Sequence, residues 1–321
     1  MISVVIPYYQ REPGILRRAL ASIAAQRDCP LPIHVIVVDD ASPAPAASEV
    51  ESVDLPCTVQ VVAQANGGPG AARNAGLDHA PSGTRFIALL DSDDEWTPSH
   101  LQRAVCALES GFQFYFADHF QLGQTVGAFE RAGRIVAAEH PALPLPLANL
   151  HAYRDDMIDQ IIRGNVIGTS TVVYDHRAFP QQRFRVELTN AGEDYLFWME
   201  LARQGATFCF SSVVEATYGR GVNVYSGATW GSEQLLLRIH HELTFRKAVC
   251  REFDLTSDQS DMLREQVAAL RGAFARSLLH RLTHLKRTST RLLFDHLKLD
   301  PASYARVPAC AWSSLSARWT S

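Results

Sequence analysis

The stretch FIALLDSDDEWTP, residues 86–98, decides the fold expected for this chain. Phe86–Leu90 is an uninterrupted apolar run, which predicts a short buried strand. The run ends directly in the acidic cluster Asp91-Ser92-Asp93-Asp94. Thr97 followed by Pro98 then predicts a helix start, with Thr97 as its cap. A buried strand, an acidic turn and a helix in immediate succession are typical of an α/β sheet.

The same alternation of strand and helix signals extends over the first 120 residues. Further strands are predicted at Ile2–Ile6 (stopped by Pro7), Ile33–Val38, Thr58–Val62 and Phe112–Ala117, with helices over 15–23 and from Gly67 onward. Strands separated by helices imply a mostly parallel, doubly wound sheet flanked by helices. The site of such a sheet lies at the carboxyl ends of its strands.

The pattern changes after Phe120. Ala138–Leu150 contains three prolines and is predicted to be a surface loop, whereas Thr171–Tyr174 is predicted to be a strand. Gly192 opens a helix whose body, Tyr195–Ala202, is apolar on nearly every side and should be buried. From about residue 231 to 299 the chain is predicted to be helical, which gives the fold a C-terminal helical extension.

Composition excludes several classes of protein. The chain has 321 residues, 47% of them hydrophobic, and carries 30 basic against 34 acidic residues. A net charge of −4 argues against a nucleic-acid partner. Six scattered cysteines without a CxxC pair indicate neither a zinc ribbon nor a disulfide scaffold and fit a reducing cytoplasm. We identify no signal peptide and no apolar run of about 20 residues, so we expect a cytoplasmic protein.

The acidic cluster is the strongest candidate for chemistry. Asp91, Asp93 and Asp94 place three carboxylates within four residues, and they repel one another unless a cation lies among them. Hard oxygen ligands select Mg²⁺ or Mn²⁺. The alternative is an acidic turn that caps the next helix, but Thr97 and Pro98 already supply that helix start. We therefore predict a metal site.

Three further groups each allow two interpretations. Asp40 follows the second strand and is either solvated or an acceptor for a ribose or base N–H. Arg73, in Gly68-Pro69-Gly70-Ala71-Ala72-Arg73-Asn74, is either part of an ordinary helix start or within reach of a nucleotide; the dinucleotide fingerprint fails because Arg73 replaces its last glycine. Glu193 and Asp194 either stabilise a helix N-terminus or supply a general base, although the helix dipole lowers the pKa of a base placed there.

Six segments together carry a family resemblance. They are Val4-Val5-Ile6-Pro7-Tyr8-Tyr9, Val37-Val38-Asp39-Asp40-Ala41-Ser42, Gly68–Leu77, Leu89-Leu90-Asp91-Ser92-Asp93-Asp94, Gly164-Asn165 with Ser170-Thr171, and Glu193-Asp194. In this order and spacing, from about Ile2 to Asn223, the chain resembles an inverting glycosyltransferase of the GT-A fold, family 2.

The resemblance implies a role for each candidate residue. Asp40 would hold the nucleotide base, usually uracil, near the backbone of Pro7 and Tyr9. Arg73 would lie beside the nucleotide. Asp91 and Asp93 would form the DxD motif, with Asp91 towards the ribose and Asp93 as the direct ligand of Mn²⁺ or Mg²⁺.

The resemblance also implies an acceptor side and a domain plan. Asp194 would be the catalytic base, and Glu193 would support the acceptor pocket. The catalytic domain would cover residues 1–225, with a nucleotide-sugar half (1–118) and an acceptor half (119–225), followed by a helical region (226–321). The expected donor is a UDP-sugar, and the expected acceptor is a glycan or a lipid-linked glycan, the common setting for bacterial relatives.

One departure concerns the segment after the base. Many relatives carry a histidine downstream of a Tyr-Arg pair, where it helps to hold the metal or the diphosphate. The corresponding segment here is Tyr218-Gly219-Arg220-Gly221-Val222-Asn223, which places Gly221 at the histidine position. Arg220 is the candidate to meet the diphosphate instead.

Two other functions remain as alternatives. A nucleotidyltransferase also has acids at strand ends, but it usually carries a Gly-rich signature with Arg and Lys after the first strand, where this chain has Ile6-Pro7-Tyr8-Tyr9-Gln10. A catalytically silent sugar-nucleotide binding module is disfavoured by the intact set of Asp91, Asp93 and Asp194.

The C-terminal helices are basic. Residues 262–300 contain eight basic residues and three acidic ones, a net charge of +5. A basic amphipathic helix can rest on anionic lipid, which would place the protein peripherally on the inner face of a membrane. The alternative is packing on the catalytic domain or on a second subunit of a homo-oligomer, and Arg281 on the apolar side of the stripe favours this packing.

Overall fold

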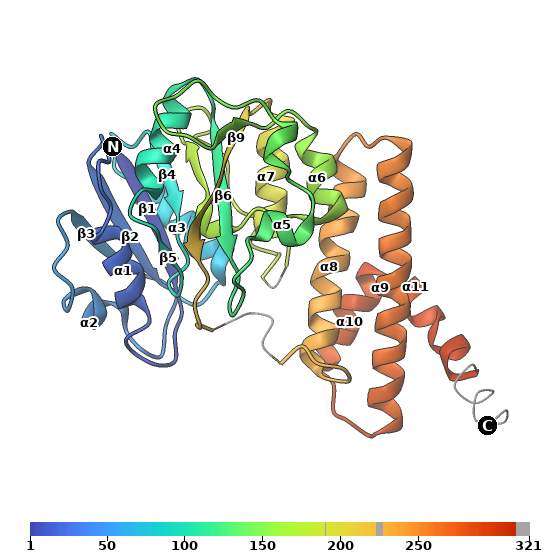
Figure 1. Cartoon of the computed structure of the whole chain (residues 1–321). Coiled ribbons are helices and arrows are strands. Elements are labelled where there is room, and N and C mark those ends of the chain that lie inside the picture. Colours follow the sequence, from blue (N-terminus) through green and yellow to red (C-terminus); the bar gives the residue numbers. More distant parts are fainter. Residues whose placement is uncertain (190, 223–226, 313–321) are drawn as a thin grey trace. The chain divides into compact units, whose positions relative to one another are not determined.

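The computed structural model describes residues 1–189, 191–222 and 227–312. The chain forms two compact units, which we describe separately (Figure 1). The sheet unit comprises residues 1–186 and 197–222, and the helical unit comprises residues 187–196 and 223–321. The domain boundary predicted at residue 225 falls within 223–226, outside the described residues.

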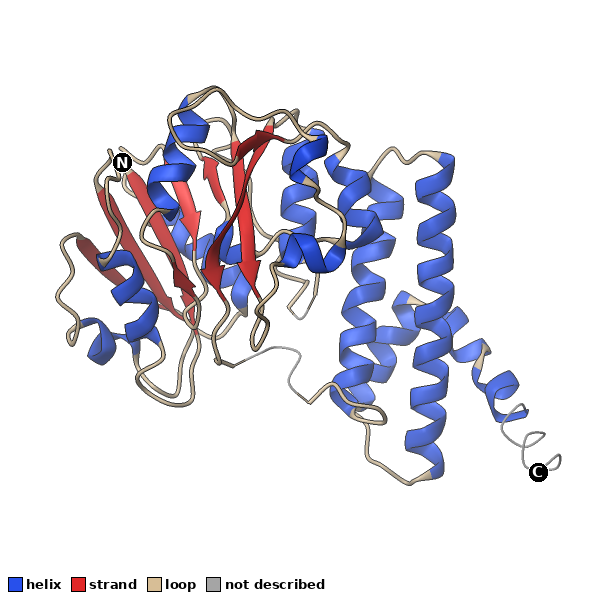
Figure 2. Ribbon diagram, in the orientation of Figure 1, coloured by secondary structure: helices blue, strands red, loops and turns tan. Residues whose placement is uncertain are grey.

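The sheet unit is built on a nine-stranded sheet with the order β3-β2-β1-β4-β8-β6-β9-β5, to which β7 adds by pairing with β9 (Figure 2). The strands are β1 (Ile2–Tyr8), β2 (Ile33–Asp39), β3 (Thr58–Ala63), β4 (Phe86–Leu89), β5 (Glu95–Trp96), β6 (Phe114–Phe120), β7 (Leu150–Ala152), β8 (Val173–Asp175) and β9 (Phe208–Thr217). The strands β3, β2, β1 and β4 are parallel, and so are β6 and β9, whereas β8, β5 and β7 pair antiparallel. The mostly parallel α/β sheet is confirmed.

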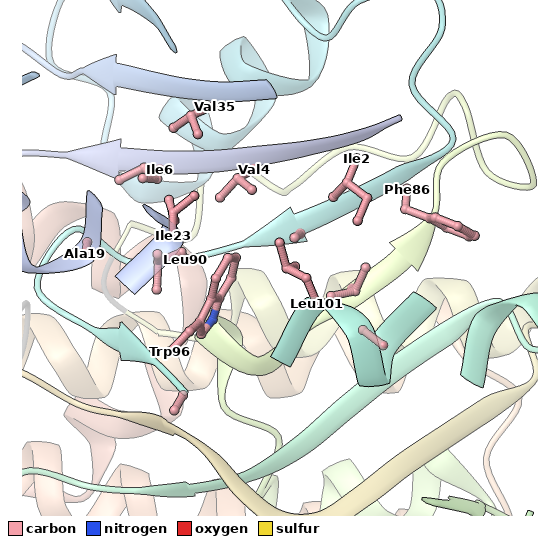
Figure 3. Close-up of a cluster of buried hydrophobic side chains, with 14 of the residues drawn as sticks. Ile2, Val4, Ile6, Ala19, Ile23, Val35, Phe86, Leu90, Trp96 and Leu101 are labelled. Atoms are coloured by element: carbon pink, nitrogen blue, oxygen red, sulfur yellow. The ribbon is translucent and has the colours of Figure 1, made fainter. Parts of the chain in front are cut away.

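Helices cover both faces of this sheet. They are α1 (Leu16–Ala24), α2 (Ala46–Val50), α3 (Pro69–Asp78), α4 (His100–Glu109), α5 (Ala128–Ala132), α6 (Met157–Gly164) and α7 (Glu193–Arg203), with 3-10 turns η1 (Ala137–Glu139) and η2 (Thr169–Thr171). On one face, Val4 and Ile6 pack with Ile23 of α1 and Leu101 of α4 (Figure 3). On the other face, Ile36 and Val38 pack with Ala72 of α3. Alternate side chains of β2 therefore pack on opposite faces of the sheet, because successive side chains of a strand point to opposite sides.

Strand β1 runs through Pro7, which we had expected to stop it. The Val5 carbonyl accepts a hydrogen bond from Leu90 on the β4 side, and the Tyr8 carbonyl accepts one from Asp40 on the β2 side. The backbone N–H and carbonyl groups of odd-numbered β1 residues therefore point toward β4. The β1–β4 pairing ends at Val5 and Leu89, so the missing N–H of Pro7 falls where no partner strand is present.

Helix α4 begins two residues later than predicted, because Thr97 does not cap it. The N–H of Thr97 donates to the carbonyl of Glu215 in β9 at 2.9 Å, which extends the short β5–β9 ladder. Ser99 occupies the N-cap position, and His100 is the first helical residue. The strand predicted at Thr171–Tyr174 is likewise shifted, to β8, because Thr169–Thr171 forms the 3-10 turn η2.

The prediction missed strand β9, because polar residues interrupt its apolar pattern. Glu215, near the end of β9, is fully buried and is satisfied by three side chains from other elements. Its carboxylate accepts from Arg103 Nε at 2.6 Å and from the Tyr115 hydroxyl at 2.7 and 2.8 Å, and it contacts His100 Nδ1 at 2.9 Å. A buried charge is tolerated in a strand when it is paired in this way.

The helical unit contains α8 (Glu233–Glu252), α9 (Ser257–Thr283), α10 (Thr290–Leu299) and α11 (Pro301–Ala305), so the predicted C-terminal helices are confirmed. Each of the first three helices starts at a hydroxyl cap, namely Ser232, Thr256 and Ser289. Their shared core includes Leu236, Leu243 and Phe274. Across the described residues, no helix is long and apolar enough to cross a bilayer.

Buried polar groups lie beside that core. The ring of His296 is fully buried and stacks on Phe274 at a centroid distance of 3.6 Å, and its Nδ1 lies 3.2 Å from Nδ1 of His240. Burial, with a smaller contribution from His240, lowers the pKa of His296 from 6.5 to about 3. Burial opposes ionisation of Asp300, but hydrogen bonds from Arg271, Lys247 and Ser303 lower the pKa of Asp300 overall.

We predict that acid destabilises the helical unit through His296. Because the folded-state pKa is about 3 and the ordinary value is 6.5, the unfolded chain binds the proton first. Stability present above about pH 6.5 is therefore lost as the pH falls, by up to about 1.4 kcal/mol per pH unit for one group. Chemical denaturation at about pH 7 and about pH 5 measures this slope.

His296→Gln should flatten that slope even if it lowers stability at every pH. His284→Gln, at an exposed position, is the matched control and should leave the slope unchanged. An equally steep slope in His296→Gln and the unmodified protein would contradict the role of His296.

Candidate active site

The predicted site residues of the sheet unit lie at the carboxyl ends of β1, β2 and β4. Asp91–Asp94 forms a tight turn directly after β4, closed by a hydrogen bond from the Asp94 N–H to the Asp91 carbonyl at 3.0 Å. Asp40 follows β2, and Pro7 and Tyr9 lie at the end of β1, both half-buried. Parallel pairing of these strands brings the three ends to one edge of the sheet, as the sequence predicted.

Asp40 organises the loop that leads into α3. The residue is 3% exposed, and its carboxylate accepts hydrogen bonds from the N–H groups of Gly67 and Gly68, both at 2.8 Å. Gln64 Nε2 donates to the same carboxylate at 2.7 Å. The solvated-loop interpretation of Asp40 is therefore wrong. Asp40 fixes the backbone at the N-terminus of α3, beside the strand ends.

Arg73 connects α3 to the acidic turn. Its guanidinium donates from Nη2 to Oδ1 of Asp91 at 2.7 Å and lies over the ring of Phe184, 5.4 Å from the centroid. The Arg73 side chain is 4% exposed, whereas that of Asp91 is 34% exposed. A charge-assisted bond from a buried arginine fixes the orientation of Asp91 while leaving part of its carboxylate open to solvent.

Ser170, in η2, bridges the two ends of the acidic turn. Its hydroxyl donates to Oδ2 of Asp94 at 2.6 Å and accepts from the N–H of Asp91 at 3.0 Å. Asp94 is 3% exposed, and its Oδ1 accepts from the N–H of Gly219 at 3.0 Å. Asp94 is thus a structural carboxylate whose bonds hold the turn in place.

The segment that leaves β9 crosses directly over the turn. The N–H of Gly221 donates to Oδ2 of Asp93 at 2.7 Å. A Cβ at Gly219 would lie 1.6 Å from the Asp93 carbonyl oxygen, and one at Gly221 would lie 2.6 Å from the Asp93 carboxyl carbon. Only glycine permits this approach. A histidine at position 221 would therefore require a different path of this segment.

Gln10 is a site residue that the sequence analysis missed. It is 3% exposed, its Nε2 donates to the Ser92 hydroxyl at 3.0 Å, and its Oε1 accepts from the N–H of Val222 at 3.0 Å. Gln10 thus joins the end of β1, the acidic turn and the crossing segment. The available signal was a polar residue four positions after the predicted strand Ile2–Ile6. Ser170 stood in a quoted motif without an assigned role.

Burial and neighbouring carboxylates raise the pKa values of two acids in the turn. Burial raises the pKa of Asp93, and the charge of Asp91 raises it further, against the N–H of Gly221, which lowers it. Burial likewise raises the pKa of Asp94 well above its usual range, with added repulsion from Asp91 and Asp93. These carboxylates therefore disfavour their own charge when no cation is near.

The donor set fits a hard divalent cation as a partial ligand shell. Asp91 and Asp93 supply carboxylate oxygens, which Mg²⁺ and Mn²⁺ prefer. Among residues 1–189, 191–222 and 227–312, no group of three or more His, Cys, Asp or Glu side chains forms a complete metal site. The remaining ligands would have to come from a bound substrate or from water.

Glu193 and Asp194 are the first two residues of α7 and belong to the helical unit, so we describe them separately. Glu193 is 9% exposed and Asp194 is half-buried. Oδ1 of Asp194 accepts from the N–H of Tyr195 at 2.9 Å, a contact within the first turn of α7. Tyr195 packs edge-on against Phe245 of α8, at a centroid distance of 5.8 Å.

Comparison with known proteins identifies the family. The sequence model of glycosyl transferase family 2 matches residues 3–172, more than half of the chain. The chain belongs to glycosyltransferase family 2. It is 35% identical over 251 residues to the succinoglycan biosynthesis protein ExoW of Rhizobium meliloti (strain 1021), covering 73% of this chain and 74% of ExoW. The family membership confirms the enzyme class predicted from the sequence, a glycosyltransferase.

Solved glycosyltransferases share the fold. The crystal structure of S. aureus TarS 1–349 in complex with UDP-GlcNAc has a TM-score of 0.57 at 20% identity, covering 96% of this chain and 83% of that one. This chain spans 50% of the longer TarS chain. The mannosyltransferase PcManGT from Pyrobaculum calidifontis, in complex with GDP-Man and Mn²⁺, has a TM-score of 0.55 at 15% identity, covering 98% and 84%. These likenesses confirm the GT-A fold of the family 2 enzyme.

We predict that Ser170→Ala destabilises the protein. The substitution removes the donor to buried Asp94 and the acceptor for the Asp91 N–H, and an unmatched buried polar group costs about 1–3 kcal/mol. Chemical denaturation should show a loss of about 2 kcal/mol in the free energy of unfolding. Ser48→Ala, at an exposed serine whose hydroxyl donates to the Pro45 carbonyl, should cost less than about 0.5 kcal/mol. Equal stability of the two variants would contradict the bridging role of Ser170.

Proposed function

We propose that this family 2 enzyme transfers a sugar, with inversion, from a nucleotide diphosphate sugar to an acceptor hydroxyl. The observation that carries the proposal is the Asp91–Asp94 turn, held beside Arg73 and Asp40 at the carboxyl edge of the parallel strands. The family membership favours transfer over the nucleotidyltransferase and silent-module alternatives. TarS in complex with UDP-GlcNAc supports a UDP-sugar as the donor.

The nucleotide would lie over the ends of β1 and β2. Asp40 would accept a hydrogen bond from the base N–H, next to the backbone of Pro7 and Tyr9. The bonds from Gly67 and Gly68 orient its carboxylate for that contact in advance. Arg73 would lie beside the nucleotide, and Asp91, held by Arg73 and partly open to solvent, would face the ribose side.

Asp93, with Asp91, would hold the Mn²⁺ or Mg²⁺ ion. When bound, such an ion offsets the negative charge that develops on the leaving diphosphate. The raised pKa of Asp93 is consistent with a carboxylate whose charge is balanced only when a cation is present. Mn²⁺ in the PcManGT complex supports this class of ion. Arg220, which is exposed, would meet the diphosphate from the crossing segment.

Asp194 would take the proton from the acceptor hydroxyl. A single displacement at the sugar C1 inverts the anomeric centre, so the protein needs a base and no nucleophile. Glu193, which is buried, would support the acceptor pocket beside Asp194. Both carboxylates lie in the first turn of α7, where a helix N-terminus favours negative charge.

The acceptor would be a glycan or a lipid-linked glycan. The relative named for succinoglycan biosynthesis supports a polysaccharide pathway. We propose that residues 1–118 form the nucleotide-sugar half, residues 119–225 the acceptor half, and residues 226–321 a helical region. The first boundary falls inside β6, so the two halves share one sheet.

Asp93→Asn should abolish metal-dependent binding of UDP. The amide is a poor ligand for a hard cation, and the residue lies in a turn outside the hydrophobic core. Calorimetric titration of UDP with and without Mn²⁺ measures the effect. Asp54→Asn, an exposed position in the same unit, is the control and should bind normally. Full Mn²⁺-dependent UDP binding by a folded Asp93→Asn protein would remove Asp93 from the metal site.

Asp194→Asn should lower sugar transfer by about 10²–10⁴, the usual contribution of a general base. UDP affinity should stay the same, because the proposed donor contacts come from Asp40, Arg73 and Asp91. Release of the nucleoside diphosphate, UDP or GDP, from a panel of UDP- and GDP-sugars with an acceptor mixture measures transfer.

Glu193→Gln is the companion variant and should have a milder effect, because Glu193 has a supporting role. Matched melting temperatures are required for the comparison. A stable Asp194→Asn protein with near-normal transfer would defeat the assignment of Asp194, and a larger loss in Glu193→Gln would transfer the role of base to Glu193.

A further inference from the structure

Large apolar side chains are exposed at one end of the helical unit. In the part of the chain that the structure describes, every exposed tryptophan and phenylalanine belongs to this unit. Trp230 is 58% exposed, Leu282 58% and Leu285 92%. These residues lie in the turn before α8, in the last turn of α9 and in the α9–α10 connection, which meet at the same end of the unit (Figure 1).

Internal hydrogen bonds hold this end in place. Arg281 is 5% exposed and donates to the Gly231 carbonyl at 3.0 Å and to the Thr288 hydroxyl at 2.7 Å. The N–H of Ser289 donates to Glu233 Oε1 at 3.1 Å, which ties the start of α10 to the start of α8. Arg281, which favoured packing over membrane contact in the sequence analysis, is therefore part of the internal structure of this end. The exposed leucines and Trp230 are presented by a fixed framework.

The same stretch of the chain is rich in exposed basic residues. Residues 280–299 contain five basic residues (Arg281, Lys286, Arg287, Arg291 and Lys298) and one acidic residue (Asp295), a net charge of +4. All of the basic residues except Arg281 are exposed. The whole chain has a net charge of −4, so the positive charge is local. On α10, Phe294 is 57% exposed and lies 4.3 Å from Nζ of Lys298.

We propose that this end of the helical unit docks on an anionic membrane surface. We call the end surface the set Trp230, Leu282, Leu285, Lys286, Arg287, Arg291 and Phe294. Exposed Trp, Phe and Leu can enter the boundary between headgroups and acyl chains, while Lys and Arg attract anionic lipid. The contact is formed by the end of a helix bundle, and not by a stripe along one helix.

Charge favours a membrane over a second copy of the chain. A two-fold contact through the end surface would place the same positive patch against itself, and like charges repel. An anionic lipid surface complements the patch. The proposal is independent of the sugar-transfer proposal, because it uses none of the residues assigned to donor, metal or acceptor.

Co-sedimentation of the full chain with vesicles tests the proposal. Vesicles of phosphatidylcholine alone are compared with vesicles that also contain phosphatidylglycerol, at low and high salt. We expect binding that depends on phosphatidylglycerol and weakens with salt.

Two variants locate the contact. Arg287→Glu with Arg291→Glu should lower vesicle partitioning by at least about twentyfold, because each basic residue near the surface contributes about fivefold. Leu285→Asn should lower partitioning by about tenfold. Leu285 has a left-handed backbone, with φ of 50°, which asparagine tolerates, so this variant should fold.

Arg251→Glu with Arg264→Glu is the matched control. It makes the same change of charge near the opposite end of α8 and α9, where both side chains are exposed, and it should leave partitioning within about twofold. UDP binding of every variant should be unchanged, which separates this proposal from the proposed function.

Three results would overturn the proposal. The first is an absence of binding to phosphatidylglycerol vesicles. The second is equal partitioning of the end-surface and control variants. The third is concentration-dependent self-association that Leu285→Asn abolishes, without vesicle binding, which would identify a second copy as the partner.

Discussion

The close approach of the residue 219–222 segment to the Asp91–Asp94 turn is the constraint on which the site depends. Two glycines permit it, because a Cβ at either position would overlap Asp93. The approach delivers two backbone N–H groups to carboxylates that would otherwise repel one another. Main-chain donors cannot rotate away as side chains can, so the turn is held in one geometry. The orientation of Asp93, one of the two candidate metal ligands, is thus set by a segment that carries no acidic residue.

Two kinds of charge burial occur in the sheet unit. Glu215 is paired with Arg103 and hydrogen-bonded to Tyr115, which makes it part of the scaffold under α4. Asp93 instead receives a neutral backbone N–H from Gly221, and burial and the charge of Asp91 raise its pKa. A compensated buried charge contributes to structure, whereas an uncompensated carboxylate favours a cation. This contrast separates scaffold acids from candidate site acids.

The parallel half of the fold could be predicted because its strands are short apolar runs, each bounded by turn residues. The acids at the strand ends could also be predicted as site candidates. The end of each apolar run marks the end of a buried strand, and the acids follow directly. Strand β9 could not, because the residues that satisfy Glu215 come from α4 and β6. The roles of Gln10 and Ser170 were also out of reach. They arise from hydrogen bonds between segments far apart in the chain, and no local pattern encodes such bonds.

The order in which the chain is synthesised gives the crossing segment a further meaning. The acidic turn is complete once residue 94 has left the ribosome, but its bridging hydroxyl arrives with Ser170 and its backbone donors arrive with Gly219 and Gly221. The part that matches the family model, residues 3–172, contains the acids without those donors. A chain that ends before β9 therefore contains the acids and Ser170 but lacks the two backbone donors that Gly219 and Gly221 supply to Asp94 and Asp93.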